Sequence, residues 1–316
     1  MTINRRFGTT DLQVFPLCLG GNVFGWTADE RQSFEVLDAY SAAGGNFVDT
    51  ADAYSAWVAG HAGGESETII GRWMKARGNR ASMIVATKVG RLASMKGLSA
   101  KTIRSGAEAS LRRLDTGHID LYFAHADDPD TPLEETLRAF DALVREGKVR
   151  YVAASNYTAP RLAEALAVSR REGLAPYVAL QPHYNLAHRQ DYEGALRDLC
   201  QREQLACVPY FALASGFLTG KYRTEADLAQ SPRGAGIKTK YMNERGMKIL
   251  GALDTVAKDR KAKCSQVALA WLMAQPTITA PIASATSIAQ LRELMAAAEL
   301  SLDRASLTVL DQASAY

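Results

Sequence analysis

The sequence predicts an α/β protein whose parallel strands close into a (β/α)8 TIM barrel. Two observations support this fold class. Short runs of β-branched and apolar residues alternate with longer stretches of helical periodicity, and eight of each are found. The first run leads into residues 19–25, whose glycines lack the G-x-G-x-x-G spacing of an open dinucleotide-binding sheet. We therefore expect residues 1–316 to form a single barrel domain, with an N-terminal β-hairpin and a long loop after strand 7.

Each expected strand is short and mostly apolar, as is typical of strands that are buried on both faces of a sheet. In chain order the expected strands are Val14–Leu19, Asn46–Val48, Met83–Thr87, Ile119–Ala124, Val149–Ala154, Tyr177–Leu180, Ala206–Phe211 and Ile278–Ala283.

Each strand is followed by a stretch in which apolar residues recur at helical spacing. The signals at one helix start are clear, because Thr131 can cap, Pro132 suits the first helical position, and Glu134 and Glu135 favour the positive end of the helix dipole. In chain order the expected helices are Asp29–Ala43, Glu65–Arg77, Ser99–Leu114, Leu133–Glu146, Ala159–Arg171, Asp191–Glu203, Ser265–Ala274 and Ile288–Glu299.

Two segments lie outside the eightfold alternation. Residues 4–15 carry the turn residues Gly8, Thr9, Thr10 and Asp11 between short polar and apolar runs, which predicts a hairpin at the bottom of the barrel. Residues 219–246 follow strand 7, are rich in Gly, Lys and Arg, and are long for a connection within a compact domain. We expect this connection to be functional or mobile.

The composition argues against several classes of protein. The chain is 47% hydrophobic and 22% charged, and its formal net charge of +3 is scattered, which indicates neither a nucleic-acid partner nor a membrane surface. The four cysteines are widely spaced and include no C-x-x-C pair, so we expect free thiols. No apolar run reaches the length of a signal peptide or a membrane helix, and the expected localisation is cytoplasmic. We predict no bound metal, whereas the oligomeric state is left undecided.

Polar residues at the carboxyl ends of the strands are the candidate active site, because TIM barrels place their catalytic groups there. Asp49 follows strand 2 with Tyr54 five residues later, Lys88 follows strand 3, and His125 follows strand 4. Each residue alone has a structural explanation, such as a helix cap, a surface lysine or a core histidine. Four ionisable side chains of different type at one barrel mouth favour a catalytic site.

Carbonyl reduction provides a role for each of the four. A proton must reach the carbonyl oxygen as hydride reaches the carbon, and a tyrosine with a pKa of about 10 is a weak acid for this at neutral pH. We expect the Lys88 ammonium to lower the pKa of Tyr54, and Asp49 to hold that lysine by a charge-assisted bond. His125 would donate to the substrate carbonyl oxygen.

The four residues lie in ordered motifs, which are Asp49–Tyr54 (DTADAY), Ala86–Lys88 (ATK), Asp120–His125 (DLYFAH), Ala154–Asn156 (ASN) and Leu180–Gln181 (LQ). Together these motifs resemble the aldo-keto reductase superfamily, in the branch of bacterial proteins related to potassium-channel β subunits. The resemblance implies a TIM barrel without a Rossmann domain, which binds NADP(H) and reduces aldehydes or ketones. It also implies that Tyr54 is the general acid, that Lys88 and Asp49 tune it, and that His125 orients the substrate.

The resemblance assigns a cofactor site as well. It places Ser155, Asn156 and Gln181 on the nicotinamide carboxamide and stacks Tyr210 on the nicotinamide ring, which suits the need for fixed amide partners and one aromatic wall. The other expected cofactor contacts are Gly21, Asn22, Phe211, Leu213, Ser215, Gly216, Lys221, Arg223, Ser284, Thr286, Gln290 and Glu293. NADP(H) is the expected cofactor, with NAD(H) as the alternative.

The chain departs from the family pattern at the adenosine end. Ser284 stands where relatives commonly have Gly, Thr286 where they have a cation, and Leu294 where they have Asn. The preference between NADPH and NADH therefore stays open at this point. Lys221, Arg223, Arg233, Lys238 and Arg292 are the candidate replacements for the missing cation.

Aromatic residues on loops at the same barrel end are the candidate substrate contacts, namely Phe24, Trp26, Trp57 and Tyr184. They point to a small-molecule carbonyl substrate without selecting among substrates. Two other functions stay open. The chain could be a nicotinamide-binding, redox-sensing regulatory subunit with little turnover, or a Schiff-base aldolase that uses Lys88 as its nucleophile.

Overall fold

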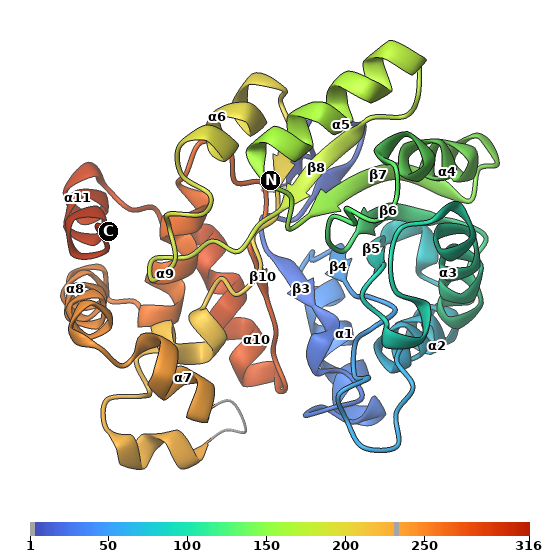
Figure 1. The fold of residues 1–316 in the computed structure, drawn as a ribbon. Helices are drawn as coiled ribbons and strands as arrows, with labels where there is room; N and C mark the ends of the chain where they lie inside the picture. Colours follow the sequence, from blue (N-terminus) through green and yellow to red (C-terminus); the bar gives the residue numbers. More distant parts are fainter. Residues whose placement is uncertain (1–3, 231–233) are drawn as a thin grey trace.

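The computed structural model describes residues 4–230 and 234–316 of the chain. Eight parallel strands form one sheet in the order β10-β3-β4-β5-β6-β7-β8-β9, which fits a (β/α)8 fold (Figure 1). The strands are β3 (Cys18–Gly20), β4 (Phe47–Asp49), β5 (Ile84–Val89), β6 (Ile119–Ala124), β7 (Val149–Ser155), β8 (Tyr177–Gln181), β9 (Ala206–Cys207) and β10 (Ile282–Ala283).

The two edge segments of this sheet are also joined by backbone contacts. Cys207 and Ile278 form a parallel bridge, and the amide of Thr279 donates to the carbonyl of Cys207 at 2.9 Å. Only two residues of each of the expected strands 206–211 and 278–283 form a regular ladder. Pro209 and Pro281 lie in these segments, and a proline has no N–H to donate to a neighbouring strand.

Helices pack around the outside of the sheet (Figure 1). Eight of them correspond to the expected helices: α1 (Glu30–Ala42), α2 (Glu65–Arg77), α3 (Ala100–Leu114), α4 (Leu133–Arg145), α5 (Ala159–Glu172), α6 (Ala195–Arg202), α9 (Cys264–Met273) and α10 (Ile288–Met295). Helix α6 begins four residues later than expected, directly after Gly194, whose φ of 88° is outside the helical range. Sequence periodicity missed three further helices: α7 (Gly234–Tyr241), α8 (Glu244–Arg260) and α11 (Arg304–Ala313).

The strands are buried on both faces, and successive side chains alternate between two apolar cores. Along β6, Leu121 and Phe123 pack inside the barrel, whereas Tyr122 and Ala124 pack against the surrounding helices. Where a polar residue follows the last inward-facing apolar residue of a strand, its side chain points into the mouth of the barrel. The candidate site is assembled from such residues.

The expected N-terminal hairpin is present as β1 (Arg5–Arg6) paired antiparallel with β2 (Gln13–Val14). Phe7 and Leu12 are buried in the inner core. Gly8 has a φ of 55°, and a Cβ at this position would lie 3.0 Å from the amide of Ala206 and the carbonyl of Gln204. The hairpin therefore packs closely against the amino end of β9.

The connection after β9 is more ordered than the long loop expected from the sequence. It contains the 3-10 helices η4 (Ala214–Thr219) and η5 (Glu225–Gln230), followed by α7. Ile237 and Tyr241 of α7 are buried, and the Tyr241 ring stacks on Phe217 at 5.6 Å between centroids. Burial of these apolar side chains accounts for the local helical order. Arg233 lies outside the described residues.

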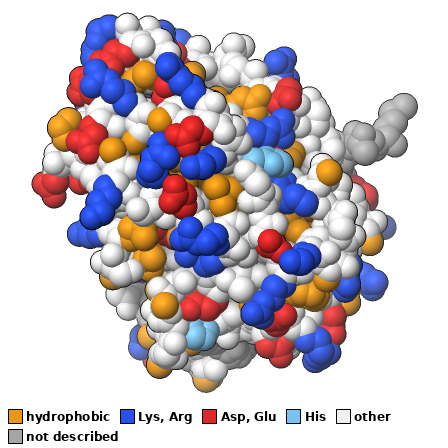
Figure 2. Space-filling model, turned by 90° about the vertical axis from the view of Figure 1, so that its right-hand side faces the viewer, with side chains coloured by type: hydrophobic (Ala, Val, Ile, Leu, Met, Phe, Trp, Pro, Cys, Tyr) orange, Lys and Arg blue, Asp and Glu red, His pale blue; other side chains and the backbone are white. Residues whose placement is uncertain are grey.

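Oppositely charged side chains are interspersed over the surface, as one face in Figure 2 shows. Several ion pairs link successive outer helices, such as Arg72 with Glu30, Arg138 with Glu172, and Arg170 with Glu203. They are solvent-exposed, so each adds little to the free energy of unfolding. Among the residues that the structure describes, no helix has both the length and the apolar character needed to cross a membrane.

Candidate active site

The carboxyl ends of β4 and β5 bring Asp49 and Lys88 together. Lys88 lies two residues beyond Ala86, which pairs with Asp49 and faces the inner core, so the Lys88 side chain also faces inward. Its Nζ donates to Asp49 Oδ2 at 2.7 Å, to the Thr50 carbonyl at 2.8 Å and to Tyr54 Oη at 2.9 Å. Lys88 has no exposed surface, and Asp49 is 1% exposed. The lysine charge is thus balanced by a carboxylate inside the barrel.

This geometry disfavours Lys88 as a Schiff-base nucleophile. An ammonium has three N–H donors and no lone pair, and all three donors of Lys88 have an oxygen acceptor. A lysine that attacks carbonyls must instead be present as the neutral amine. The bonding of Lys88 is that of a charged residue that organises its neighbours.

Tyr54 completes the cluster from the turn that follows β4. Its hydroxyl donates to Asp49 Oδ2 at 3.0 Å and accepts from Lys88. Burial, followed by the negative charge of Asp49, raises the pKa of Tyr54 well above its usual value. This corrects the expected lowering of that pKa by Lys88, whose charge is matched by Asp49. In the ligand-free protein Tyr54 is therefore protonated at neutral pH, which is the form that can donate a proton.

His125 follows β6, and its backbone amide donates to the Val89 carbonyl at 2.9 Å. Its ring centroid lies 6.2 Å from that of Tyr54, and its buried Nδ1 has no hydrogen-bond partner among the residues that the structure describes. Burial and the nearby charge of Lys88 lower the pKa of His125 well below its usual range. The imidazole is therefore neutral, and one ring nitrogen can donate to an oxygen in the mouth.

The residues expected to bind the carboxamide form a hydrogen-bonded network that joins this cluster. Gln181 Nε2 donates to Asp49 Oδ1 at 2.8 Å, and Asn156 Nδ2 donates to the His125 carbonyl at 2.9 Å. Tyr210 Oη donates to Asn156 Oδ1 at 2.7 Å, while Ser155 Oγ donates to the Gln181 carbonyl. The ends of β7 and β8 are thereby tied to the four ionisable residues.

The donors and acceptors in this network fit a nicotinamide carboxamide. The side-chain oxygen of Gln181 accepts no hydrogen bond from any described residue, so it is free to accept an amide N–H. Farther along the chain, Ala214, Ser215 and Gly216 have positive φ angles of 49°, 60° and 99°. This conformation is strained for Ala214 and Ser215, and the amides of Ala214 and Gly216 donate to the carbonyls of Phe211 and Leu213 at 2.7 and 2.8 Å. These residues lie where the pyrophosphate contacts were expected.

Other expected cofactor residues are also brought together. Ser284 of the β10 segment donates to Asn22 Oδ1 at 2.5 Å, which joins the first and last strands of the barrel. The Thr286 amide and hydroxyl both donate to Gln290 Oε1, and Ser265 Oγ donates to Glu293. In the ligand-free protein these polar groups therefore satisfy one another.

The two cations expected near the phosphates differ in their environment. Arg223 donates to the carboxylate of Asp254 at 2.7 Å and to the Gly220 carbonyl. Lys221 is exposed, with its Nζ 5.0 Å from the ring centroid of Tyr222, and has no ion pair with any described residue. Of the two, Lys221 is the cation available to a phosphate.

Only two of the four expected substrate aromatics are accessible. Trp57 is 52% exposed and packs edge-to-face on Trp26 at 5.5 Å and on Tyr54 at 6.2 Å. Phe24 and Tyr184 are buried, and the Tyr184 hydroxyl donates to Glu193. These two are core residues, because loop aromatics pack inward wherever a neighbouring element offers apolar contact.

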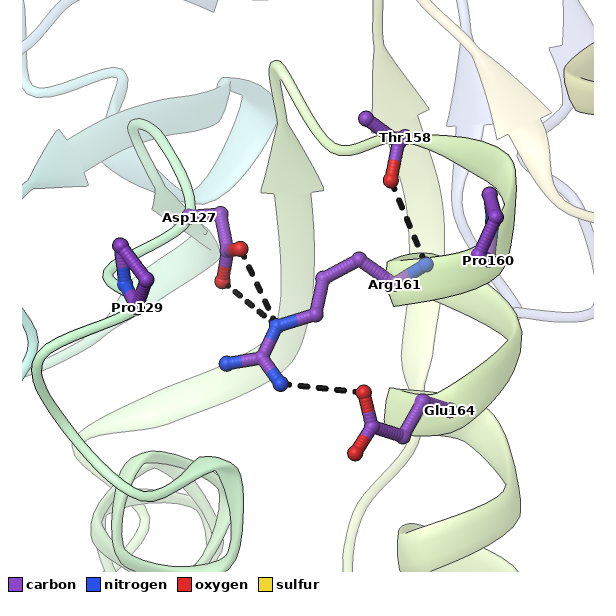
Figure 3. A pocket seen from close by; sticks show the side chains of 6 residues that line it. All are labelled: Asp127, Pro129, Thr158, Pro160, Arg161 and Glu164. Atoms are coloured by element: carbon purple, nitrogen blue, oxygen red, sulfur yellow. Dashed lines mark hydrogen bonds and ion pairs between the residues drawn. The ribbon is translucent and has the colours of Figure 1, made fainter.

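Sequence reasoning missed an ion pair that links the loop after His125 to helix α5. Arg161 Nε donates to both oxygens of Asp127 at 2.9 and 3.1 Å, and Arg161 also pairs with Glu164 (Figure 3). These residues border a hollow of about 420 Å³. Asp127 lies two residues after His125, so the pair fastens the His125 loop to the start of α5. No local pattern could have identified partners that are 34 residues apart.

A buried carboxyl behind the site was missed as well. Asp52 lies within the motif of Asp49 and Tyr54 and is 1% exposed, and neither of its carboxyl oxygens has a hydrogen-bond partner in the part of the chain that the structure describes. Glu67 lies nearby and is held by Thr87 and Arg113. Burial, followed by the charge of Glu67, raises the pKa of Asp52 to about 7.

The fold is of the (β/α)8 class, and its ionisable side chains gather at the carboxyl ends of the strands. The sequence profile of the Aldo/keto reductase family matches residues 16–315, and the chain belongs to this family. The uncharacterized oxidoreductase YrpG of Bacillus subtilis (strain 168) is 36% identical, with 96% of this chain and 93% of that protein covered.

Two further relatives differ in function. The aryl-alcohol dehydrogenase [NADP(+)] of Phanerodontia chrysosporium is 32% identical, with 95% of this chain and 82% of that protein covered. The probable voltage-gated potassium channel subunit beta of Oryza sativa subsp. japonica is also 32% identical, with 94% and 91% covered. The expected relationship to the potassium-channel branch is thereby confirmed.

Proposed function

We propose that this protein is an NADP(H)-dependent reductase of aldehydes or ketones in which Tyr54 is the general acid. The observation that carries the proposal is the Tyr54 hydroxyl, which lies between Lys88 Nζ at 2.9 Å and Asp49 Oδ2 at 3.0 Å. Both partners are buried, so the position of the hydroxyl is fixed before a substrate arrives.

Each residue of the cluster has a separate task in this reaction. Tyr54 donates its proton to the carbonyl oxygen, and the ammonium of Lys88 stabilises the phenolate that this leaves. Asp49 keeps Lys88 charged and in place, while neutral His125 donates to the same carbonyl oxygen and aligns it. Because His125 is neutral, it directs the substrate without adding a second positive charge beside Lys88.

A nicotinamide cofactor would supply the hydride when bound. Ser155, Asn156 and Gln181 would hold its carboxamide, with Tyr210 stacked against its ring. The left-handed stretch that includes Ser215 and Gly216 would contact the pyrophosphate. NADP(H) is the proposed form, because Lys221 is a cation without an acidic partner among the described residues.

The direct test uses the purified wild-type chain. NADPH should quench its tryptophan fluorescence on binding and should be oxidised when 4-nitrobenzaldehyde is added, as followed at 340 nm. If the protein neither binds NADPH or NADH nor oxidises either with a panel of aldehydes and ketones, the proposal is wrong.

The choice between NADPH and NADH depends on Lys221. Replacement by alanine should weaken NADPH binding about tenfold and leave NADH binding nearly unchanged, because only NADPH carries the 2′-phosphate. Titration of fluorescence quenching with each cofactor measures both affinities. The matched control is Arg223→Ala, which should change the NADPH-to-NADH ratio less because Arg223 is already paired with Asp254. An unchanged ratio in Lys221→Ala would remove this residue from 2′-phosphate recognition.

Trp57 supports a preference for flat aromatic carbonyls. It is exposed, lies edge-to-face against Tyr54, and thus offers an aromatic surface beside the proton donor. Trp57→Ala should raise KM for 4-nitrobenzaldehyde about fivefold and leave KM for butanal within about twofold. Trp57→Phe should retain most of the wild-type behaviour. Equal changes for both aldehydes would argue against an aromatic contact.

The relationship to a channel subunit supports a second candidate function, a nicotinamide-binding regulatory protein with little turnover. Both functions use the same cofactor residues, so cofactor binding alone does not separate them. Turnover does. Reduction at more than about one carbonyl per second would favour the enzyme, whereas tight NADPH binding without turnover across the carbonyl panel would favour the regulatory role.

A further inference from the structure

Two histidines extend the aromatic wall formed by Tyr210. The His183 ring lies nearly parallel to that of Tyr210, with centroids 5.3 Å apart and an angle of 19°. The His188 ring stacks on the other histidine with centroids 3.7 Å apart and an angle of 10°. Tyr210, His183 and His188 therefore form one column of three rings, which we call the His column. Neither histidine takes part in the proton transfer proposed above.

Backbone contacts hold the His column in register. Residues 183 and 210 form a parallel bridge between the segments that follow β8 and β9. Asn185 and His188 exchange two backbone hydrogen bonds of 3.1 and 2.9 Å, a tight turn that folds the second histidine back over the first. Asn185 Nδ2 also donates to the Phe211 carbonyl at 2.8 Å, which ties this turn to the residue after Tyr210. The backbone hydrogen bonds of this loop thus hold the two histidine rings in their stacked positions.

The charges around the His column leave its middle ring neutral. Two imidazolium rings 3.7 Å apart would repel each other, which disfavours a charged ring at His183. His188 Nε2 lies 2.7 Å from the Asp191 carboxylate, whereas the buried His183 Nε2 has no hydrogen-bond partner within residues 4–230 and 234–316. Burial, followed by His188, lowers the pKa of His183 to about 4, while the charge of Asp191 opposes this shift and Lys240 of α7 adds to it. A neutral, flat ring therefore faces Tyr210.

We propose that His183, backed by His188, is a positioning residue that fixes the plane of the Tyr210 ring and so sets the affinity for the nicotinamide ring. The inference rests on the proposed function, in which Tyr210 stacks on that ring. The Tyr210 hydroxyl donates to Asn156, and Phe211 packs edge-on against the ring with centroids 5.2 Å apart. His183 is the neighbour that lies nearly parallel to the ring, so it restrains rotation of the ring out of its plane.

The test compares a substitution that removes the middle ring with one that keeps it. His183→Ala should weaken NADPH binding about three- to tenfold in fluorescence titrations, the range expected for loss of one aromatic stacking contact. His183→Phe should stay within about twofold of wild type. His118→Ala serves as the control, because His118 pairs with Asp120 near the start of β6 and contacts no part of the His column. Wild-type affinity in His183→Ala, or equal loss in the Ala and Phe variants, would overturn the inference.

A second measurement needs no cofactor. NMR of a sample with labelled tyrosine rings should show one well-defined Tyr210 ring environment in the wild type and in His183→Phe, and exchange-broadened ring signals in His183→Ala. If the wild type binds no nicotinamide cofactor but these ring signals behave as expected, the proposed function fails while the positioning role of His183 stands. If Tyr210 is equally ordered in all three proteins, the positioning role is wrong whatever the cofactor measurements show.

Discussion

Replacement of Tyr54 by phenylalanine should lower kcat for carbonyl reduction by about 10³-fold, within the range that a positioned general acid contributes. The substitution removes one oxygen and no ring atom. Lys88 keeps Asp49 and the Thr50 carbonyl as acceptors, so the buried charge stays paired. NADPH affinity and the unfolding temperature should therefore change little. Steady-state kinetics, fluorescence titration and thermal unfolding separate these effects.

The matched control for this prediction is Tyr151→Phe. The Tyr151 hydroxyl bonds to Asp11 of the N-terminal hairpin segment, far from the mouth of the barrel. This variant loses the same atom and should keep the wild-type kcat. Full activity of Tyr54→Phe would contradict the assigned proton donor, and a parallel loss of NADPH binding would indicate a disturbed site.

Replacement of Asp52 by asparagine should stabilise the protein at neutral and alkaline pH. The pKa of Asp52 is about 7 in the folded chain, against an ordinary value of 3.8. Between these two values the unfolded chain releases a proton that the folded chain retains, so folding stability falls as pH rises and levels off above pH 7. This pKa shift lowers the free energy of unfolding by about 4 kcal/mol at most, and asparagine removes the penalty because it does not ionise. We expect Asp52→Asn to gain roughly 2–4 kcal/mol at pH 8 and almost nothing below pH 4.

Denaturant unfolding of both proteins at several pH values measures this gain. The control is Asp120→Asn, the same substitution at a buried carboxylate that pairs with Arg80 and Arg150 and accepts from the Val85 amide. That variant should be destabilised, because it leaves buried donors and a guanidinium without their partner. A pH-independent difference between wild type and Asp52→Asn would show that Asp52 does not hold a proton when folded.

Much of the site could be predicted because it depends on local order. Asp49, Lys88 and His125 each lie where an apolar run ends, and parallel strands bring such positions to one end of a barrel. The Tyr54 position follows from its spacing after Asp49. The cofactor residues were identified from the family resemblance, which is carried by short motifs at the same strand ends.

The errors have a common physical origin in packing between distant segments. Phe24 and Tyr184 were expected in a pocket, yet neighbouring elements bury both. The connection after β9 was expected to be a long loop, yet Tyr241 stacks on Phe217 and orders it. Periodicity within a window cannot indicate which partner a loop side chain meets.

Local periodicity was enough to predict the alternation of strands and helices and the ionisable residues at the strand ends. The protonation of those residues, in contrast, depends on contacts between segments that are distant in the sequence. Gln181 reaches Asp49 across 132 positions of sequence, and burial raises the pKa of Tyr54 where Lys88 alone would lower it. The pKa of a group depends on the charges around it and on how far it is removed from water. In this site most of the nearby charges and of the burial come from segments that are distant in the sequence.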